Sequence, residues 1–393
     1  MPQSEITIAE QLKQAGYHTG MVGKWHLGHL DRYMPWNQGF DEFYGVPFSN
    51  DMANFFFFEN EKMVHEPIDQ RYLTRRYTEK ALDYIERHAD RPFFLYLAHS
   101  MPHVPLYVSP EFEGSSRLGL YGDVVQELDW STGEVVALLR KLHLLDNTLI
   151  IFSSDNGPWL AMGDHGGSAG QLRDGKGSTF EGGQRVPTIA HWPAQIAPGA
   201  VSEAPASQVD LMPTFSALVG VPLPDDRVID GKDITGVLTG QGQRSDQRFY
   251  YMSSASTRVA AYRDGDWKVK LPRVGYPVFL EPILHLDRYS HGLMLFNLSD
   301  DPTEQHNLAD KFPQRVAQMK QSLFELEQGI EQEHVRALYM RSTDADRKGY
   351  GPLIAKGLLM AAVCLLLVLA LLYGLLRACR YYWHTARRRI RNG

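Results

Sequence analysis

The sequence predicts an α/β protein whose mostly parallel sheet is sandwiched by helices, followed by a smaller domain. Short, continuously apolar segments, such as residues 92–98 (PFFLYLA) and 148–154 (TLIIFSS), alternate with segments of helical periodicity. Strands that are buried on both faces have uninterrupted apolar sequences, and parallel strands are joined through helices. We therefore expect residues 1–240 to form one large domain around a parallel sheet.

The helices of this domain are predicted from apolar residues that recur at the helical period. The first is also marked by its ends, because Thr7 and Glu10 form a capping box and Gly16 is a typical stop. The expected helices are residues 7–16, 75–88, 118–142 and 209–219, and a further strand is residues 186–191.

The pattern of the sequence changes after residue 240, from apolar segments alternating with helices to segments typical of a β-hairpin. Residues 241–341 are therefore predicted to form a small antiparallel α+β domain. Residues 248–252 and 259–271 have the composition of strands, and the second segment contains a hairpin turn at Asp264–Gly265. An amphipathic helix is expected at residues 313–331.

A terminal transmembrane helix is predicted at residues 357–376, which are twenty residues without a charge. Such a helix spans roughly 30 Å, the thickness of a bilayer core. A polar linker, residues 342–356, precedes it, and a basic tail, residues 377–393, follows it. Because basic residues favour the cytoplasmic side, we expect a single-pass protein with a cytoplasmic carboxyl terminus and an extracytoplasmic (periplasmic, lumenal or extracellular) globular domain.

Charge and cysteine content exclude several classes of function. The net charge of −6 combines six arginines in the tail with −12 on the remaining residues, so nucleic acid is not an expected partner. The only cysteines, Cys364 and Cys379, lie in or directly after the apolar segment. A disulfide framework or a cysteine zinc site is therefore excluded from the globular part. The composition does not indicate an oligomeric state.

Polar residues follow three of the apolar segments. Lys24 and His26 come after the short segment at residues 20–22, His103 comes after residues 92–98, and Asp155 with Asn156 comes after residues 148–154. The carboxyl ends of parallel strands share one edge of a sheet, and ligands bind at that edge. We expect these side chains to converge there.

The chemistry of these residues fits a tetrahedral anion with a metal beside it. The carboxylate and amide at residues 155–156 are ligands for Ca²⁺, with Mg²⁺ the less favoured ion. Lys24 and Lys176 supply positive charge, and His26 and His103 supply hydrogen bonds or a proton. Together they describe a site for an ester whose leaving oxygen is protonated.

Each feature also has an ordinary structural explanation. An Asp-Asn-Gly sequence after a strand is often only a turn, and a histidine between prolines, like His103, often only bonds its loop. We interpret four other histidines in that way: His18, His29, His99 and His165. Residues 170–176 match a Walker A loop until the position that requires Ser or Thr, which is Gly177. No apolar strand precedes them, so nucleotide binding is not predicted.

Taken together, five segments resemble sulfatases of the arylsulfatase type, in order and in spacing. The resemblance covers roughly residues 5–335. The segments are residues 20–29 (GMVGKWHLGH), 93–105 (FFLYLAHSMPHVP), 150–158 (IIFSSDNGP), 175–193 (GKGSTFEGGQRVPTIAHWP) and 293–309 (LMLFNLSDDPTEQHNLA).

The resemblance implies an alkaline-phosphatase-like core and a role for each site residue. Lys24 and His26 would hold the nucleophile and the sulfate, and Lys176 would contact a sulfate oxygen. His103 would donate a proton to the leaving oxygen, and residues 155–156 would bind calcium. Only the resemblance makes the reaction sulfate ester hydrolysis, on a small molecule or a sulfated glycan.

Two elements of the family pattern do not occur. The family converts a cysteine or serine within a Cys/Ser-x-Pro/Ala-x-Arg motif to formylglycine, and no such motif is present. It also places an Asp-Asp pair on its first strand, whereas the pairs here, Asp225-Asp226 and Asp300-Asp301, come late. Since the family has both elements before the segment at residues 20–29, we expect an amino-terminal segment to be missing and the chain as written to be inactive.

Two alternatives remain open at this point. The same core supports phosphatases and phosphonate monoester hydrolases, which activity on each type of ester would separate. A non-catalytic, membrane-anchored binder of sulfated glycans is the alternative from another class. Residues 50–70 are expected to contribute to substrate choice, but their sequence does not identify the ester.

Overall fold

The computed structural model describes residues 1–52, 56–64, 68–252, 259–271 and 292–330. Within these ranges, no helix combines the length and the apolar character needed to cross a membrane. The predicted linker (342–356), transmembrane helix (357–376) and basic tail (377–393) lie outside the described residues.

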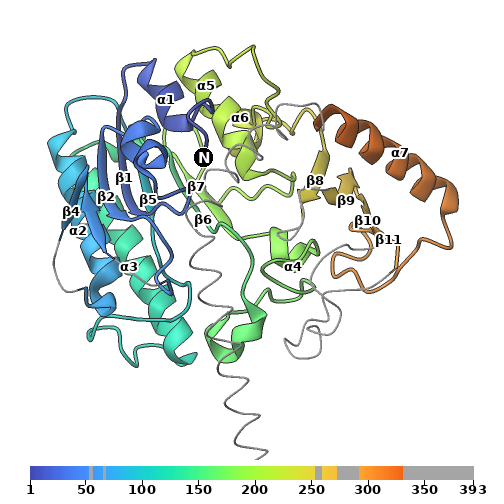
Figure 1. The fold of residues 1–393 in the computed structure, drawn as a ribbon, viewed down its shortest axis with the longest axis horizontal. Coiled ribbons are helices and arrows are strands. Elements are labelled where there is room, and N and C mark those ends of the chain that lie inside the picture. The colour runs from blue at the N-terminus through green and yellow to red at the C-terminus, as the bar shows by residue number, and fades with distance from the viewer. Residues whose placement is uncertain (53–55, 65–67, 253–258, 272–291, 331–393) are drawn as a thin grey trace, which may run out of the picture. The chain divides into compact units, whose positions relative to one another are not determined.

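The main sheet has the strand order β4-β3-β2-β1-β5 (Figure 1). The strand β1 at its centre runs parallel to both β2 and β5, whereas β3 and β4 form an antiparallel hairpin on the edge of β2. The sheet is therefore mixed, not mostly parallel as predicted, because this hairpin extends it on one side. The strands are β1 (His18–Lys24), β2 (Glu42–Val46), β3 (Phe57–Glu59), β4 (Lys62–Val64) and β5 (Phe93–Ala98).

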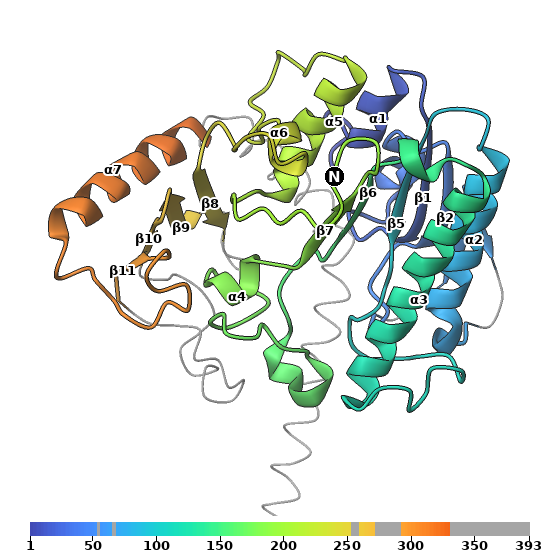
Figure 2. The same cartoon turned by 180° about the vertical axis from the view of Figure 1, so that it is seen from behind.

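Helices cover both faces of this sheet, as predicted (Figures 1 and 2). Successive residues of β1 point to opposite faces, so Met21 packs in the cluster that contains Ala9 of α1, and Val22 packs with Tyr77 of α2 and Val124 of α3. The helix α5 lies on the Met21 face. The bounds are α1 (Ile8–Lys13), α2 (Leu73–Arg87), α3 (Gly119–Lys141) and α5 (Leu211–Val219).

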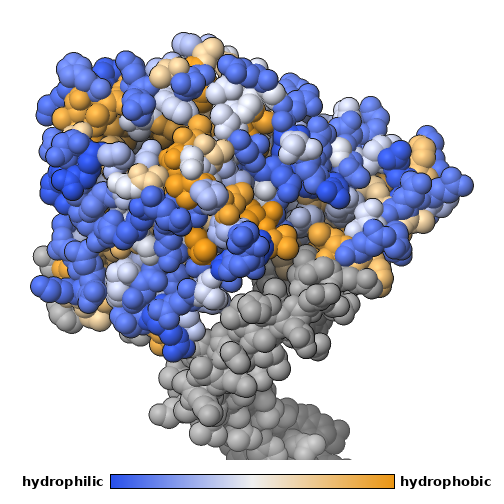
Figure 3. Space-filling view, turned by 90° about the horizontal axis from the view of Figure 1, so that it is seen from above, coloured by the Kyte–Doolittle hydropathy of each residue, from blue (hydrophilic) through white to orange (hydrophobic). Residues whose placement is uncertain are grey.

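The strand β6 (Ile150–Ser153) differs from its prediction. It pairs antiparallel with β7 (Thr188–His191) in a separate two-stranded sheet, and its side chains are only partly buried. Large apolar side chains are exposed on these two strands, at Phe152 of β6 and Ile189 of β7, and on the edge strand β5, at Tyr96. Figure 3 shows apolar side chains gathered among hydrophilic ones on one face of the molecule. The apolar segment therefore predicted the strand but not its partner.

The smaller sheet is antiparallel with the order β11-β10-β9-β8, as predicted for this region. Its central hairpin turns at Gly265, whose φ of +58° lies in the region that glycine adopts without strain. The elements are β8 (Arg248–Met252), β9 (Val259–Asp264), β10 (Trp267–Lys270), β11 (Met294–Asn297) and α7 (Pro313–Ile330).

The remaining elements of the described residues are short helices. The capping box of Thr7 and Glu10 is formed at α1, with both reciprocal hydrogen bonds present. The short α-helices are α4 (Glu181–Gln184) and α6 (Thr235–Leu238). The 3-10 helices are Asp31–Tyr33, Pro35–Asn37, Gln70–Tyr72, Leu145–Asn147, Leu160–His165 and Gln208–Asp210.

Candidate active site

Lys24 and His26 lie where β1 ends. Gly23 brings this strand close to β5, because a Cβ at Gly23 would lie 1.9 Å from the carbonyl oxygen of Ala98. His26 then has a φ of +58°, an uncommon conformation for a residue other than glycine. Such backbone conformations persist where the surroundings impose them and are frequent at functional sites. The end of β1 is thus built to hold a defined turn.

His103 follows β5 and is fixed through its Nδ1 atom. This nitrogen lies 2.7 Å from the carbonyl oxygen of Val104, which can only accept, so Nδ1 carries the proton. The hydroxyl of Ser49 lies 3.2 Å from the same nitrogen. In the neutral ring the Nε2 atom therefore has the lone pair, and in the protonated ring Nε2–H is the donor not engaged by Val104.

Asp155 and Asn156 directly follow β6. The amide nitrogen of Asn156 donates to the carbonyl of Gly157 at 3.3 Å, which orients the amide oxygen away from that bond. Asp155 is exposed and Asn156 half-buried. One carboxylate and one amide oxygen are hard donors, so this pair fits Ca²⁺ as the resemblance implies.

Lys176 reaches the same region from the segment before α4. Its backbone nitrogen donates to the carbonyl of Pro158 at 2.8 Å, which ties this segment to the turn after β6. The Lys176 ammonium lies 5.0 Å from the ring centre of Trp159, and the His103 ring lies 5.7 Å from the same indole. Trp159 thus connects the lysine to the loop after β5.

The charges of the site act on one another. Burial lowers the pKa of Lys24; the carboxylate of Asp155 opposes that shift, Lys176 adds to it, and Asp51 opposes it. The residues that sequence spacing placed at one edge therefore lie within electrostatic reach, although they come from separate sheets.

Both histidines of the site have a lowered pKa. For His26 the causes are burial and then the charge of Lys24, and for His103 they are burial and then the charge of Lys176. The hydrogen bond to Val104 works in the opposite direction for His103. Two positive lysines beside two neutral rings suit the binding of an anion.

A buried ion cluster attaches the Lys176 segment to the smaller sheet. The Lys268 ammonium of β10 lies 2.8 Å from Glu181 of α4 and 2.9 Å from Glu304. Glu304 also accepts a hydrogen bond from the Glu181 backbone nitrogen at 2.6 Å. The guanidinium of Arg173, three residues before Lys176, donates to the Glu304 carbonyl at 2.7 Å. The smaller domain thereby holds the segment that presents Lys176.

The sequence did not indicate several residues of this region. Asp51 and Ser49 lie in a stretch without a recognisable pattern, and Trp159 resembles any aromatic residue in a loop. Lys268 and Glu304 are charged residues in a strand and a loop, and charge in such places usually faces solvent. No local signal could have identified them, because their partners are far away in the chain.

The chain is similar to known sulfatases. The family model for sulfatases matches residues 1–221. N-acetylgalactosamine-6-sulfatase of Canis lupus familiaris is 40% identical over 270 residues, which are 64% of this chain and 52% of the relative. Arylsulfatase A of Bos taurus is 35% identical over 363 residues, which are 83% of this chain and 71% of the relative.

A solved structure agrees with these relatives. It comes from work on glycosaminoglycan metabolism by Bacteroides thetaiotaomicron and has 28% identity, a TM-score of 0.74, and coverage of 84% of this chain and 83% of its own. The chain spans about half the length of the N-acetylgalactosamine-6-sulfatase that it matches. On the combined match of sequence and fold, this chain belongs to the sulfatase family of sulfuric ester hydrolases.

Proposed function

We propose that this chain contributes the anion- and calcium-binding part of a sulfuric ester hydrolase that acts on a sulfate-ester small molecule or a sulfated glycan. Two observations carry the proposal: the Lys176 backbone is hydrogen-bonded to Pro158 in the turn after β6, and Asp155 and Lys176 both act on the pKa of Lys24 at the end of β1. Two cations beside one carboxylate suit a site that binds a sulfate and a divalent cation together.

Each residue has a role in this proposal. Lys24 and Lys176 bind the sulfate oxygens, and His26 donates a hydrogen bond at the same edge. His103, held at Nδ1 by Val104, presents Nε2–H to the leaving oxygen and transfers its proton as the ester bond breaks. Residues 155–156 would hold Ca²⁺, which supplies positive charge to the sulfate when bound.

The lowered pKa of His103 has a consequence for this role. Because burial and Lys176 favour the neutral ring, the proton of His103 is readily given up. The negative charge of a bound sulfate ester counteracts the positive charge of Lys176. It therefore favours the protonated His103 ring before the proton is transferred. Proton donation is therefore linked to the presence of the anion.

Calcium binding by the 393-residue chain tests the proposal. Asp155→Ala removes the carboxylate, so we expect the calcium affinity measured by calorimetry to fall at least about tenfold. Asp146→Ala, an equally exposed acid that precedes β6, is the matched control and should leave the affinity unchanged. Equal calcium affinity in Asp155→Ala and the unsubstituted chain would refute the metal assignment.

Turnover is a separate question from binding. The printed sequence has no Cys/Ser-x-Pro/Ala-x-Arg motif. Loss of a covalent nucleophile removes most of the rate, so we expect these 393 residues to bind an aryl sulfate without measurable hydrolysis. Hydrolysis above background would contradict this expectation, and comparison with a phosphonate monoester would show which ester the site favours.

We further propose that residues 357–376 anchor the protein in a membrane with the catalytic domain extracytoplasmic. The support is the uncharged segment of twenty residues and the six arginines after it. The full chain should partition with membranes and resist extraction by high salt, because apolar burial is not weakened by salt. Release by salt alone would refute the anchor.

A further inference from the structure

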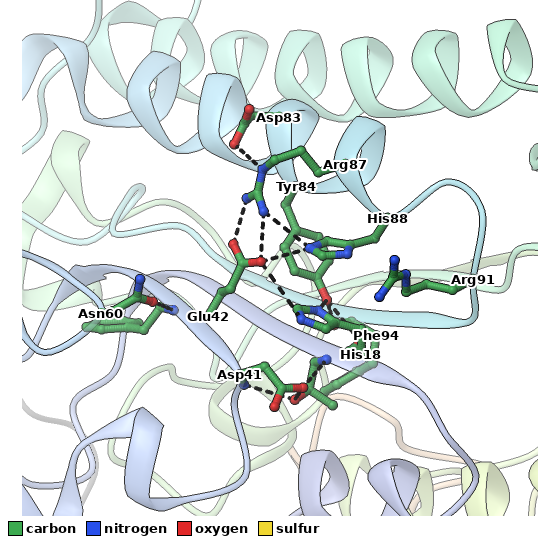
Figure 4. A network of polar contacts seen from close by, with 12 residues as sticks. His18, Asp41, Glu42, Asn60, Asp83, Tyr84, Arg87, His88, Arg91 and Phe94 are labelled. Atoms are coloured by element: carbon green, nitrogen blue, oxygen red, sulfur yellow. Dashed lines mark hydrogen bonds and ion pairs between the residues drawn. The ribbon is translucent and has the colours of Figure 1, made fainter.

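A second group of charged side chains, drawn in Figure 4, lies at the start of β1, at the other end of this strand from Lys24. His18 begins β1, Glu42 begins β2, and His88 directly follows α2. One ligand atom from each of the three lies within 4.8 Å of the others. The two imidazole rings are stacked with 3.8 Å between their centres. Three separate elements thus bring two imidazoles and a carboxylate close together.

The hydrogen bonds of Tyr84 fix the proton of His18. The single proton of the Tyr84 hydroxyl is shared by two acceptors, the carbonyl oxygens of His18 and Phe94, at 2.9 and 3.2 Å. Its oxygen therefore accepts from the Nδ1 atom of His18, which lies 3.2 Å away. A neutral His18 then has its lone pair on Nε2, and this atom faces the Oε1 atom of Glu42 at 3.9 Å. Either a proton or a metal ion between the two atoms would satisfy both of them.

The same oxygen of Glu42 already attracts other groups. Its Oε1 atom lies 2.8 Å from His88 Nε2 and 2.8 Å from Arg87 Nη1, although these two nitrogens are themselves only 3.3 Å apart. The Nδ1 atom of His88 is buried and has no hydrogen-bond partner among the described residues. Nitrogen atoms of Arg87 and His88 thus share one carboxylate oxygen, while a second nitrogen of His88 has no hydrogen-bond partner among the described residues.

We propose that His18, Glu42 and His88 form a binding site for a divalent transition-metal ion of the zinc type. Two imidazole nitrogens and one carboxylate oxygen are a known ligand set for Zn²⁺, with a water molecule in the fourth position. Tetrahedral bonds of about 2.1 Å place ligand atoms about 3.4 Å apart. The observed separations of 2.8 and 3.9 Å from Glu42 Oε1 bracket that value, and all three ligand atoms lie within 4.8 Å of one another. The two imidazole rings are stacked with 20° between their planes, so metal binding has to turn at least one ring out of the stack.

The ligand set distinguishes this site from the calcium site proposed above. Ca²⁺ takes oxygen ligands, whereas imidazole nitrogen selects zinc and its neighbours in the transition series. The two sites are also far apart, because His18 and Lys24 are the first and last residues of β1. Six steps along an extended strand, at about 3.3 Å each, separate them by about 20 Å. The proposal therefore does not depend on the proposed sulfatase chemistry.

Arg87 competes with the proposed metal ion for the carboxylate of Glu42. Its guanidinium forms two hydrogen bonds with Glu42, at 2.6 and 2.8 Å, and one with Asp83 at 2.9 Å. Metal binding has to release Arg87 from Glu42, and Asp83 remains as its partner afterwards. The ion would then join β1, β2 and the end of α2 directly, at the end of the sheet opposite to the active site.

Zinc titration of the full chain tests the proposal, with the protein in detergent micelles, without a polyhistidine tag and stripped of metal. We expect one saturable Zn²⁺ per chain by calorimetry, and at least tenfold weaker binding in Glu42→Gln and His88→Ala. His143→Asn, at an exposed histidine outside the cluster, and Asp155→Ala should bind zinc like the unsubstituted chain. Absence of saturable binding, or equal binding in Glu42→Gln, would overturn the proposal.

Arg87→Gln gives the sharper test, because it does not remove a ligand. Without the competing guanidinium, Glu42 is free to coordinate, so zinc affinity should rise severalfold. Circular dichroism of each variant shows whether it is folded. Zinc affinity that is unchanged or weaker in folded Arg87→Gln would show that Glu42 does not bind the ion, even if His88→Ala fails to fold.

Discussion

Two ion clusters among the described residues use similar side chains in different surroundings. The cluster of Glu181, Lys268 and Glu304 is completely enclosed, with 0–4% of each side chain exposed. In the pair of Glu42 and Arg87 these fractions are 28% and 45%. A charge that cannot reach water depends on its partner, whereas a half-exposed charge can exchange its partner for water or for another cation. The enclosed cluster therefore suits fixation of the Lys176 segment, and the open cluster suits exchange.

The enclosed cluster should give the largest loss of stability. Lys268→Met leaves Glu181 and Glu304 buried without their cation, and breaking a buried pair in this way costs about 3–5 kcal/mol. Urea denaturation of the folded variant measures the free energy of unfolding. Lys268→Arg, which keeps the charge, is the control and should lose less. A loss below about 1 kcal/mol for Lys268→Met would show that enclosure does not decide the contribution.

The same variant should affect the site locally. Because Glu181 and Glu304 hold the segment around Lys176, hydrogen exchange at residues 173–184 should become faster in Lys268→Met than in Lys268→Arg. Faster exchange that is spread evenly over the chain would indicate only a general loss of stability.

The open cluster should show an intermediate effect that depends on pH. Hydrogen bonds from Arg87, opposed by burial and supported by His88, lower the pKa of Glu42 from 4.5 to about 2. A folded-state pKa below the unfolded value stabilises the fold fully above pH 4.5, and this stabilisation is lost as the pH falls toward 2. With solvent screening, we expect Glu42→Gln to cost about 1–2 kcal/mol at neutral pH.

The measurement compares the unfolding free energies of Glu42→Gln and the unsubstituted chain between pH 7 and 2, with EDTA present to remove metal ions. The difference should disappear toward pH 2. His18, His88 and Asp41 also surround this position, so the difference between the two proteins, and not either curve alone, isolates Glu42. If the difference in unfolding free energy did not change with pH, the loss of stability would come from altered packing and not from the charge of Glu42.

These clusters also show how far the sequence alone leads. The capping box of Thr7 and Glu10 and the hairpin at Gly265 were predicted because their signals lie within a few residues. The position of β6 was predicted as well, but its pairing with β7 was not, because an apolar segment does not encode its neighbour. The main sheet proved to be mixed for the same reason, since nothing in the sequence places the hairpin of β3 and β4 on the edge of β2.

Prediction of the charged residues was limited in the same way. Lys24 and His103 could be proposed as site residues because a polar residue after a strand is a local pattern, and their roles remain predictions. His18 was assigned to an ordinary hydrogen-bonding role, and its partner His88 lies seventy positions later, where a histidine after a helix is unremarkable. Only the fold shows that the two rings are stacked. Sequence reasoning thus finds site residues that share a recurring local context and misses clusters formed by tertiary packing.

The smallest effect is expected at a highly exposed pair, Arg91 with Asp90, whose side chains are 53% and 76% exposed. Exposed pairs contribute about 0–1 kcal/mol, so Arg91→Gln should change the unfolding free energy by less than about 0.5 kcal/mol. The charge of Arg91 nevertheless reaches His18, whose pKa is lowered by burial, then by His88, and least by Arg91. Arg91→Gln should therefore raise the pKa of His18 slightly, which a proton NMR titration of the imidazole measures. A loss of stability as large as that of Glu42→Gln would mean that exposure does not rank these pairs, and the contrast between the two clusters would have to come from hydrogen-bond geometry instead.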